Sequence, residues 1–388
     1  MSLGLGYGEE DVAARAGRLG CACPEDGARA LRRLPGQWQL AGGFALIVLA
    51  QALTLGVLPL AGAMLDDGRL FHGLPMAGLP LAAFFLGAAC ASLPATFLLD
   101  AFGRRAGFAL GASLGVAGGL IAAYAVTMRL FPALVVGGFW LGAAQGFGMF
   151  YRHAAAFGAG GTGRAGVIAR LLGAGALAGL IGPAAAGAAE ALFTPFTFVG
   201  TLMLAALAQL GALAFAVALP EARFSHAEMT VEAGATAEPT IALRWRALVV
   251  PTLAGIFAWG AMTSAMASAP LAMADCGIGL PVISGVVAWH VVAMYAPALL
   301  GGRLALMLGD AGVALCGVVL CVGAAGLTHL QADAAWIGAG FLLVGAGWSL
   351  ATLGATLMLH GRGVPSRLQL AAHDAALLAA ALVGTLLA

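Results

Sequence analysis

Lysine is absent from the 388 residues, and charged side chains of any kind make up only 9% of the chain. Soluble domains carry about 25% charged residues. The scarcity of charge, with 62% apolar residues and a mean hydropathy of +0.99, excludes a soluble globular protein and indicates a membrane protein with many spans. The formal net charge is only +1, which gives no sign of a nucleic-acid partner.

The missing lysine also excludes the phosphate-binding Gly-x-x-x-x-Gly-Lys-Ser/Thr element, so nucleotide-driven pumping by this chain is not expected. Neither His-Glu-x-x-His nor Cys-x-x-Cys occurs, which argues against a hydrolytic or structural zinc site. The six cysteines are scattered, and four lie in or beside apolar stretches, so no secreted disulfide framework is predicted. We therefore expect neither an enzyme nor a resident cofactor.

Apolar runs of about 18 residues or more can cross a bilayer as helices, and they predict an all-α polytopic protein with eleven spans. The runs cover residues 38–64, 75–99, 108–128, 131–151, 168–189, 194–219, 247–273, 281–302, 311–330, 335–358 and 368–388. Residues 1–37 lack a long apolar core, so they are interpreted as a polar tail and not as a cleaved signal peptide.

The longest internal polar stretch, 220–246, has the composition of a linker and includes a Gly-Ala-Thr-Ala-Glu-Pro run. It divides the chain into a six-span bundle over 38–219 and a five-span bundle over 247–388. Basic residues in short loops stay on the cytoplasmic side of a membrane. A cytoplasmic tail places 16 of the 18 arginines on that side, with only Arg69 and Arg129 opposite. We expect a multi-pass inner-membrane protein with a cytoplasmic N-terminus.

A short charged motif follows the second span: Asp100-Ala-Phe-Gly103-Arg104-Arg105. It resembles the signature Gly-x-x-x-Asp-Arg-x-Gly-Arg-Arg of the major facilitator superfamily, with Thr96 in place of the first glycine and Ala101 in place of the first arginine. Glycine allows a tight turn, and the acid and base can latch helix ends in one conformation and release them in another. The resemblance implies two helical bundles, nominally twelve spans and secondary transport. An ordinary basic loop is the alternative reading of the motif.

Two pairs of soft ligands lie in the apolar spans of the second half: Met262-x-x-x-Met266 and His290-x-x-x-Met294. A four-residue step places both members of a pair on one helix face. Thioether and imidazole donors suit monovalent copper. At 1.5 Å per residue, Met266 and Met262 lie roughly 10 and 16 Å below the outer surface, and His290 and Met294 roughly 13 and 20 Å below it. The matched depths predict one copper site between the seventh and eighth spans.

The second half from Trp259 to Asp374, with both pairs, resembles the CcoA-like copper importers, a branch of the major facilitator superfamily. The resemblance implies that the four ligand residues bind copper as the transported substrate. It also implies that the copper supplies assembly of the cbb-type cytochrome c oxidase. A cytoplasmic copper acceptor is a further expected partner, besides the lipid bilayer, and we expect a monomer. Core packing by methionine is the alternative explanation of either pair taken alone.

Two other functions remain open. A facilitator for a small organic solute, such as riboflavin or a drug-like compound, would use an apolar cavity lined by aromatic side chains. These are Trp259, Trp289, Tyr295 and Trp348. A non-transporting scaffold is suggested because the eleventh span ends at the last residue, where relatives of this fold have a twelfth.

Several other polar residues have an ordinary interpretation beside a functional one. His373-Asp374 can relay a proton or can be solvated near an interface. Arg152-His153 is expected to anchor its helix at the headgroup boundary. Cys276 can pass metal inward or be a small apolar residue. The two cysteines of the polar tail can receive the metal after passage or be incidental. They are Cys21 and Cys23.

Overall fold

The computed structural model describes residues 36–66, 76–157, 163–220, 242–330, 333–361 and 363–387. This part of the chain is helical, apart from one β-bridge between Ala242 and Val364. The predicted tail and most of the predicted linker lie outside the described residues. The helices are α3 (Gln37–Leu65), α4 (Leu79–Thr127), α5 (Phe131–Gly148), α6 (Phe150–Phe157), α7 (Gly163–Ala174), α8 (Ala176–Leu192), α9 (Val199–Val217), α11 (Trp245–Asp275), α12 (Leu280–Tyr295), the 3-10 helix η1 (Ala296–Leu300), α13 (Gly301–Leu330), α14 (Ala334–Gly361) and α15 (Arg367–Leu386).

Nine helical stretches in the described residues are long and apolar enough to cross a membrane. Two of them contain two spans each, because the chain turns a corner at a left-handed glycine. These corners are Gly103 in α4, with φ 82°, and Gly309 in α13, with φ 70°. Glycine adopts this backbone conformation without the steric cost that a Cβ atom adds. The eleven predicted spans are therefore all helical.

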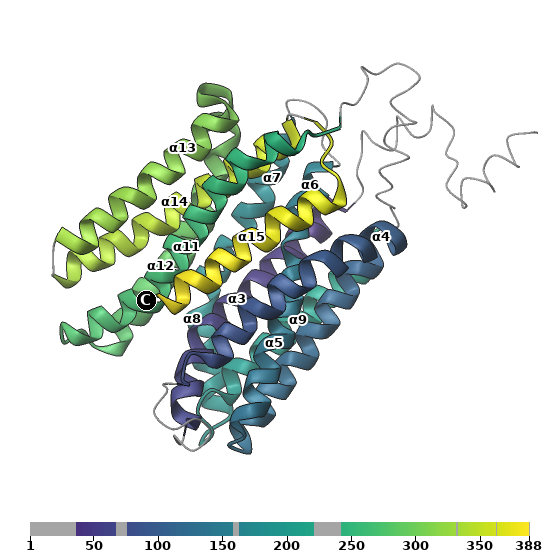
Figure 1. The fold of residues 1–388 in the computed structure, drawn as a ribbon. Helices are drawn as coiled ribbons and strands as arrows, with labels where there is room; N and C mark the ends of the chain where they lie inside the picture. Colours follow the sequence, from purple (N-terminus) through teal and green to yellow (C-terminus); the bar gives the residue numbers. More distant parts are fainter. Residues whose placement is uncertain are drawn as a thin grey trace, which may run out of the picture.

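The helices pack as two groups that follow the order of the chain (Figure 1). In the first group, α4 packs along α5 and α9, and α3 packs along α9. In the second group, α14 packs along α13 and α11, and α11 packs along α15. The groups meet most extensively along two helix pairs, α4 with α15 and α8 with α12, and they also meet where α6 and α7 contact η1, α13 and α14. We refer to α3–α9 as the first bundle and to α11–α15 as the second bundle.

Arginines gather at one end of the bundles. Strict alternation of the spans places the corner of α4, the end of α6 and the starts of α7, α11 and α15 at the same end. We call it the arginine-rich end, and it carries Arg104, Arg105, Arg152, Arg164, Arg244, Arg246, Arg303 and Arg367. The sequence predicts that this end faces the cytoplasm.

Small residues allow α8 and α12 to cross closely. A Cβ atom built on Gly179 would lie 2.7 Å from the carbonyl oxygen of Ala288 and 2.8 Å from the amide nitrogen of Val292. Farther from the arginine-rich end the crossing is looser, because a Cβ on Gly187 or on Gly285 would meet nothing within 4 Å. The close contact of α8 with α12 that Gly179 makes in the described residues is therefore near the middle of the stretch 164–192.

Candidate functional site

A buried polar network connects the bundles near the arginine-rich end. Arg152 of α6 donates a hydrogen bond to the carboxylate of Asp374 of α15 and forms an ion pair with it. His153 Nε2 lies 3.2 Å from Asp374 Oδ2, and His153 Nδ1 lies 3.0 Å from Nε2 of His360 on α14. Asp374 is fully buried, and His153 is only 1% exposed. The network is thus a contact between bundles in a place without access to water.

Two further contacts extend this network. The hydroxyl of Thr252 on α11 lies 2.9 Å from His373 Nδ1, and Arg164 of α7 donates to the backbone carbonyl of His360. The expectation that Arg152-His153 anchors a helix at the headgroup boundary is wrong, and so is the solvated reading of His373-Asp374. Both pairs are covered where the two bundles meet, because α15 packs between α11 and α4 (Figure 1).

The charged motif after the second span also contacts the second bundle. Asp100 Oδ2 lies 3.0 Å from the guanidinium of Arg367 at the start of α15. Gly103 forms the corner, and the buried Arg104 donates from Nε to the carbonyl of Pro220, at 3.3 Å. Arg105 is exposed at the same corner. The acid and the first arginine thus connect the corner to two other segments of the chain.

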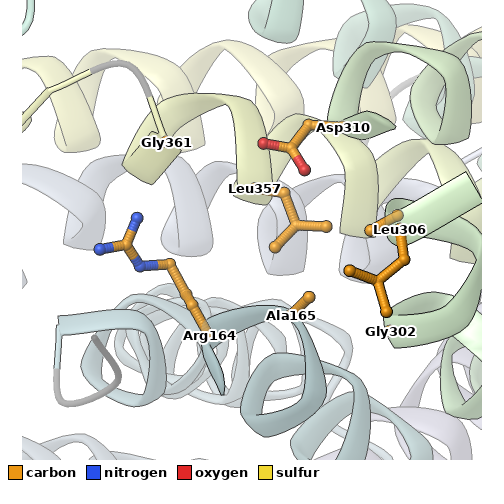
Figure 2. A pocket seen from close by; sticks show the side chains of 8 residues that line it. Arg164, Ala165, Gly302, Leu306, Asp310, Leu357 and Gly361 are labelled. Carbon is orange, nitrogen blue, oxygen red and sulfur yellow. The ribbon is translucent and has the colours of Figure 1, made fainter. Parts of the chain in front are cut away.

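The corner at Gly309 forms part of a cavity of about 310 Å³ between α7, α13 and α14. Arg164 and Asp310 lie on its two sides, with Leu357 between them, and Gly361 lies at its edge (Figure 2). This cavity reaches the arginine-rich end of both bundles, and one of its lining residues, Gly361, directly follows His360 in the chain.

A cluster of aromatic rings connects the same two bundles. The ring of Phe44 on α3 lies 6.0 Å from that of Tyr295 on α12, measured between centroids. Tyr295 lies 5.4 Å from Trp348 of α14, which lies 5.2 Å from Trp259 of α11. The separations and tilts are those of favourable edge-to-face pairs. On the other side Phe44 contacts Tyr151, at 6.3 Å. We call these five residues the aromatic cluster.

Several polar atoms in the aromatic cluster lack hydrogen-bond partners in the described part of the chain. They are Nε1 of Trp259, Nε1 of Trp348 and the hydroxyl of Tyr151. All three side chains are buried. A buried polar group without a partner costs about 1–3 kcal/mol, and native structures contain few of them. Two neighbouring indole donors and a phenol are therefore candidates for contact with a bound solute.

The organic-solute alternative predicted three of these aromatic residues and missed two. Trp259, Tyr295 and Trp348 are in the cluster, whereas Trp289 is 61% exposed and lies outside this buried group. Phe44 and Tyr151 were not predicted, because aromatic residues are common in apolar spans and spacing alone does not show which of them meet across a bundle interface.

The four predicted copper ligands lie on α11 and α12. Met262, His290 and Met294 are buried, and Met266 is half-buried. Helix α14 packs extensively on both α11 and α12, which have only a small contact with each other. His290 stacks on Phe341 of α14, with ring centroids 3.8 Å apart, and its Nδ1 lies 2.6 Å from the carbonyl oxygen of Phe341. Its Nε2 is buried without a partner in the described residues.

The cysteines add no metal cluster to the described residues. Within this part of the chain no group of three or more His, Cys, Asp and Glu side chains is arranged to hold a metal ion. Cys276 is exposed at the end of α11. Cys21 and Cys23 lie outside the described residues.

No protein-family model matches the chain. The riboflavin transporter RfnT of Brucella anthropi is 28% identical to it over 325 residues, which cover 83% of this chain and 81% of RfnT. The human organic anion transporter MFSD10 superposes with a TM-score of 0.66 at 16% identity, over 92% of this chain and 91% of that one. The chain adopts the major facilitator superfamily fold. The xylose transporter XylE from E. coli shares the fold, with a TM-score of 0.66 at 14% identity over 90% and 89% of the two chains.

The major facilitator fold confirms the predicted fold class. It also explains why the contacts between bundles involve the second span with the eleventh, and the fifth with the eighth. These pairs occupy equivalent positions in the two halves of a parallel repeat.

Proposed function

We propose that the chain is a secondary transporter for a small organic solute with a planar aromatic ring, of the flavin type. One observation carries the proposal: two buried indole N–H groups, of Trp259 and Trp348, have no partner among the described residues and lie in a ring cluster that both bundles share. The similarity to a riboflavin transporter over most of both chains supports the same solute class. Binding sites of this fold occur near the membrane midplane between the halves.

Physical chemistry explains why such a cluster suits this solute. Aromatic pairs in offset or edge-to-face geometry add about 0.5–1.5 kcal/mol beyond the burial of their area. A flavin-type ring also carries carbonyl oxygens and ring nitrogens that accept hydrogen bonds. Each indole donor that finds such an acceptor regains about 1–3 kcal/mol of its desolvation penalty. A solute without acceptors leaves these donors unpaired, so the site favours a polar heterocycle over a hydrocarbon.

The contacts between bundles support a transport cycle of alternating access. The polar network and the pair of Asp100 with Arg367 lie toward the arginine-rich end, and the Gly179 crossing lies near the middle of the stretch 164–192. If that end faces the cytoplasm, as the sequence predicts, the described state is closed toward the cytoplasm. Solute release then requires these contacts to separate.

Uptake of radiolabelled riboflavin by purified protein in liposomes tests the proposal. Trp348→Phe keeps an aromatic ring but removes the donor, and it should raise the KM for riboflavin about 5- to 30-fold, which corresponds to about 1–2 kcal/mol. Trp140→Phe on α5 is the matched control, because Trp140 is partly exposed and lies outside the aromatic cluster. Equal KM values for the two variants would contradict the proposed role of the indole donor.

Copper import is a second candidate, and the surroundings of His290 favour it. Histidines that bind metals usually bond a backbone carbonyl through one ring nitrogen, which fixes the tautomer and leaves the other nitrogen for the metal. His290 has this arrangement, with Nδ1 on the carbonyl of Phe341 and Nε2 without a partner. Met294 is one turn farther on the same helix face and is also buried.

Accumulation of radioactive copper in cells separates the two candidates. If copper is the substrate, Met266→Ala and His290→Ala abolish copper accumulation, and riboflavin transport stays absent in the wild type. If a flavin is the substrate, both variants lose at most a modest part of riboflavin uptake. Met307→Ala is the matched control, because this methionine is exposed on α13. Only the copper outcome would support delivery to a cytoplasmic acceptor and to assembly of the cbb-type oxidase.

A further inference from the structure

Ionisable side chains of both bundles meet at one buried place: Arg152 and His153 from the first bundle, and His360 and Asp374 from the second. Ionisable groups inside a membrane are costly, and chains of Asp, Glu and His are typical of proton paths. We propose that Asp374 binds the coupling proton of this transporter, and that His153 and His360 carry this proton between Asp374 and the arginine-rich end. The inference rests on the transport function proposed above.

The geometry of the three side chains forms a continuous path. His360 Nε2 is 3.0 Å from His153 Nδ1, and His153 Nε2 is 3.2 Å from Asp374 Oδ2. An imidazole can take a proton on one ring nitrogen while it releases the proton of the other, so His153 can pass a proton without moving. His360 is in the last turn of α14, where Arg164 bonds its carbonyl and Gly361 borders the 310 Å³ cavity (Figure 2). The path thus ends at His360, one residue before the cavity-lining Gly361.

A proton on Asp374 changes the contact between the bundles. The carboxylate is the counter-charge of Arg152, and these two residues lie on α15 and α6, in different bundles. Protonation forms an O–H bond on the carboxyl group and removes its negative charge, while the Nε2–H bond of His153 breaks and His153 Nδ1 takes a proton from His360 Nε2. The buried Arg152 then has no counter-charge in the network, which destabilises the closed contact. Binding of the proton therefore favours separation of the bundles at the arginine-rich end, and its release favours closure.

The other charged and titratable groups near the network do not replace Asp374 as an acceptor, because they are cationic, neutral or at helix ends. On α11 and α4, the two helices packed against α15, the charged residues lie only at the ends or at the Gly103 corner. The groups on α11 and α4 are Arg246, Asp275, Asp100, Arg104 and Arg105, with Asp100 paired to Arg367. The others are His373 beside Thr252, Tyr295 within electrostatic reach of Arg152, and Arg164 with Asp310, which lies at the Gly309 corner across the cavity from Arg164 (Figure 2).

The first test uses riboflavin as the probe in proteoliposomes. We expect an imposed pH gradient to drive net accumulation in the wild type. Asp374→Asn should lower this accumulation at least about tenfold, while exchange of labelled for unlabelled riboflavin stays within about twofold of the wild type, because exchange needs no net proton movement. Asp333→Asn, an exposed carboxylate at the far end of α14, is the matched control. His360→Gln interrupts the path and should lower gradient-driven accumulation too.

The second test needs no solute. Spin labels at Ala101→Cys and Leu368→Cys, in a chain whose six cysteines are replaced by alanine, report the distance across the pair of Asp100 and Arg367, because both positions are exposed beside it. Between about pH 8 and about pH 5, the population with separated labels should rise at least about tenfold in the wild type. In Asp374→Asn it should not depend on pH.

The outcomes distinguish the two proposals. If riboflavin exchange is absent in the wild type but label separation depends on pH and on Asp374, the solute assignment fails and the proton site is supported. If label separation is the same at both pH values, or if Asp374→Asn keeps the pH response, the proton site is overturned whatever the solute is. If Asp374→Asn does not give a monodisperse protein, the wild-type pH response and His360→Gln decide.

Discussion

Replacement of Gly179 by alanine should shift the protein away from the closed state. The added Cβ would lie 2.7 Å from the carbonyl oxygen of Ala288 and 2.8 Å from the amide nitrogen of Val292, where ordinary contact begins at 3.4 Å. These are backbone atoms of α12, so no side chain can rotate away. The helices α8 and α12 must therefore separate by about 0.7 Å to accept one methyl group.

The size of the effect follows from the cost of overpacking, about 1–3 kcal/mol. This strain exists only while α8 and α12 are in contact, so it raises the ratio of separated to closed molecules roughly 5- to 150-fold. Alanine also improves helix propensity by about 1 kcal/mol relative to glycine. Gly187→Ala on the same helix provides that gain without the clash, since its Cβ meets nothing within 4 Å.

The spin labels at positions 101 and 368 measure this shift at constant pH. Gly179→Ala should show a larger separated population than both the wild type and Gly187→Ala, and gradient-driven riboflavin uptake should change only in Gly179→Ala. Identical distance distributions for the two alanine variants would refute the argument that this crossing holds the closed state together.

Two further predictions concern stability. Glu190 accepts hydrogen bonds from the amides of Phe198 and Thr201, at 2.8 and 2.7 Å, and so caps α9 where Phe198 has φ 69°. In thermal unfolding in detergent, Glu190→Ala should lower the free energy of unfolding by about 1–3 kcal/mol, and Glu190→Gln should lower it by less because it keeps one acceptor. Gly103→Ala forces a side chain into a left-handed corner and should cost about 1–2 kcal/mol in the same assay, whereas Gly78→Ala, which has φ −79° and open space, should not destabilise the protein.

The sequence was sufficient to predict the fold because the length of an apolar run determines whether a helix can cross the membrane. The predicted boundaries 38–64 and 335–358 differ by one to three residues from α3 and α14. Arginine placement and the Asp100 motif were sufficient to indicate the superfamily fold. A tight turn was predicted at Gly103 because glycine has no Cβ atom, and the structure has its corner there, with a positive φ at this glycine.

The site was less predictable because its residues come from helices distant in sequence. Arg152 and Asp374 are each near the end of a span, and nothing in either span indicates that the two helices cross there. His360 was not singled out, although an ionisable residue at the end of an apolar run was a signal for it. His290 was singled out because an ionisable residue inside a membrane is costly, but its bond to Phe341 requires knowledge of how α12 and α14 pack.

The crossing of α8 and α12 is close at Gly179 but not along the whole length of the two helices. Past Gly179, the stretches around Gly187 and Gly285 do not touch each other closely in the described residues. A rigid antibody fragment shaped as a wedge for these stretches would prevent them from approaching, and so arrest the cycle without competing for the solute. Such a reagent would act from the side of the membrane opposite the arginines.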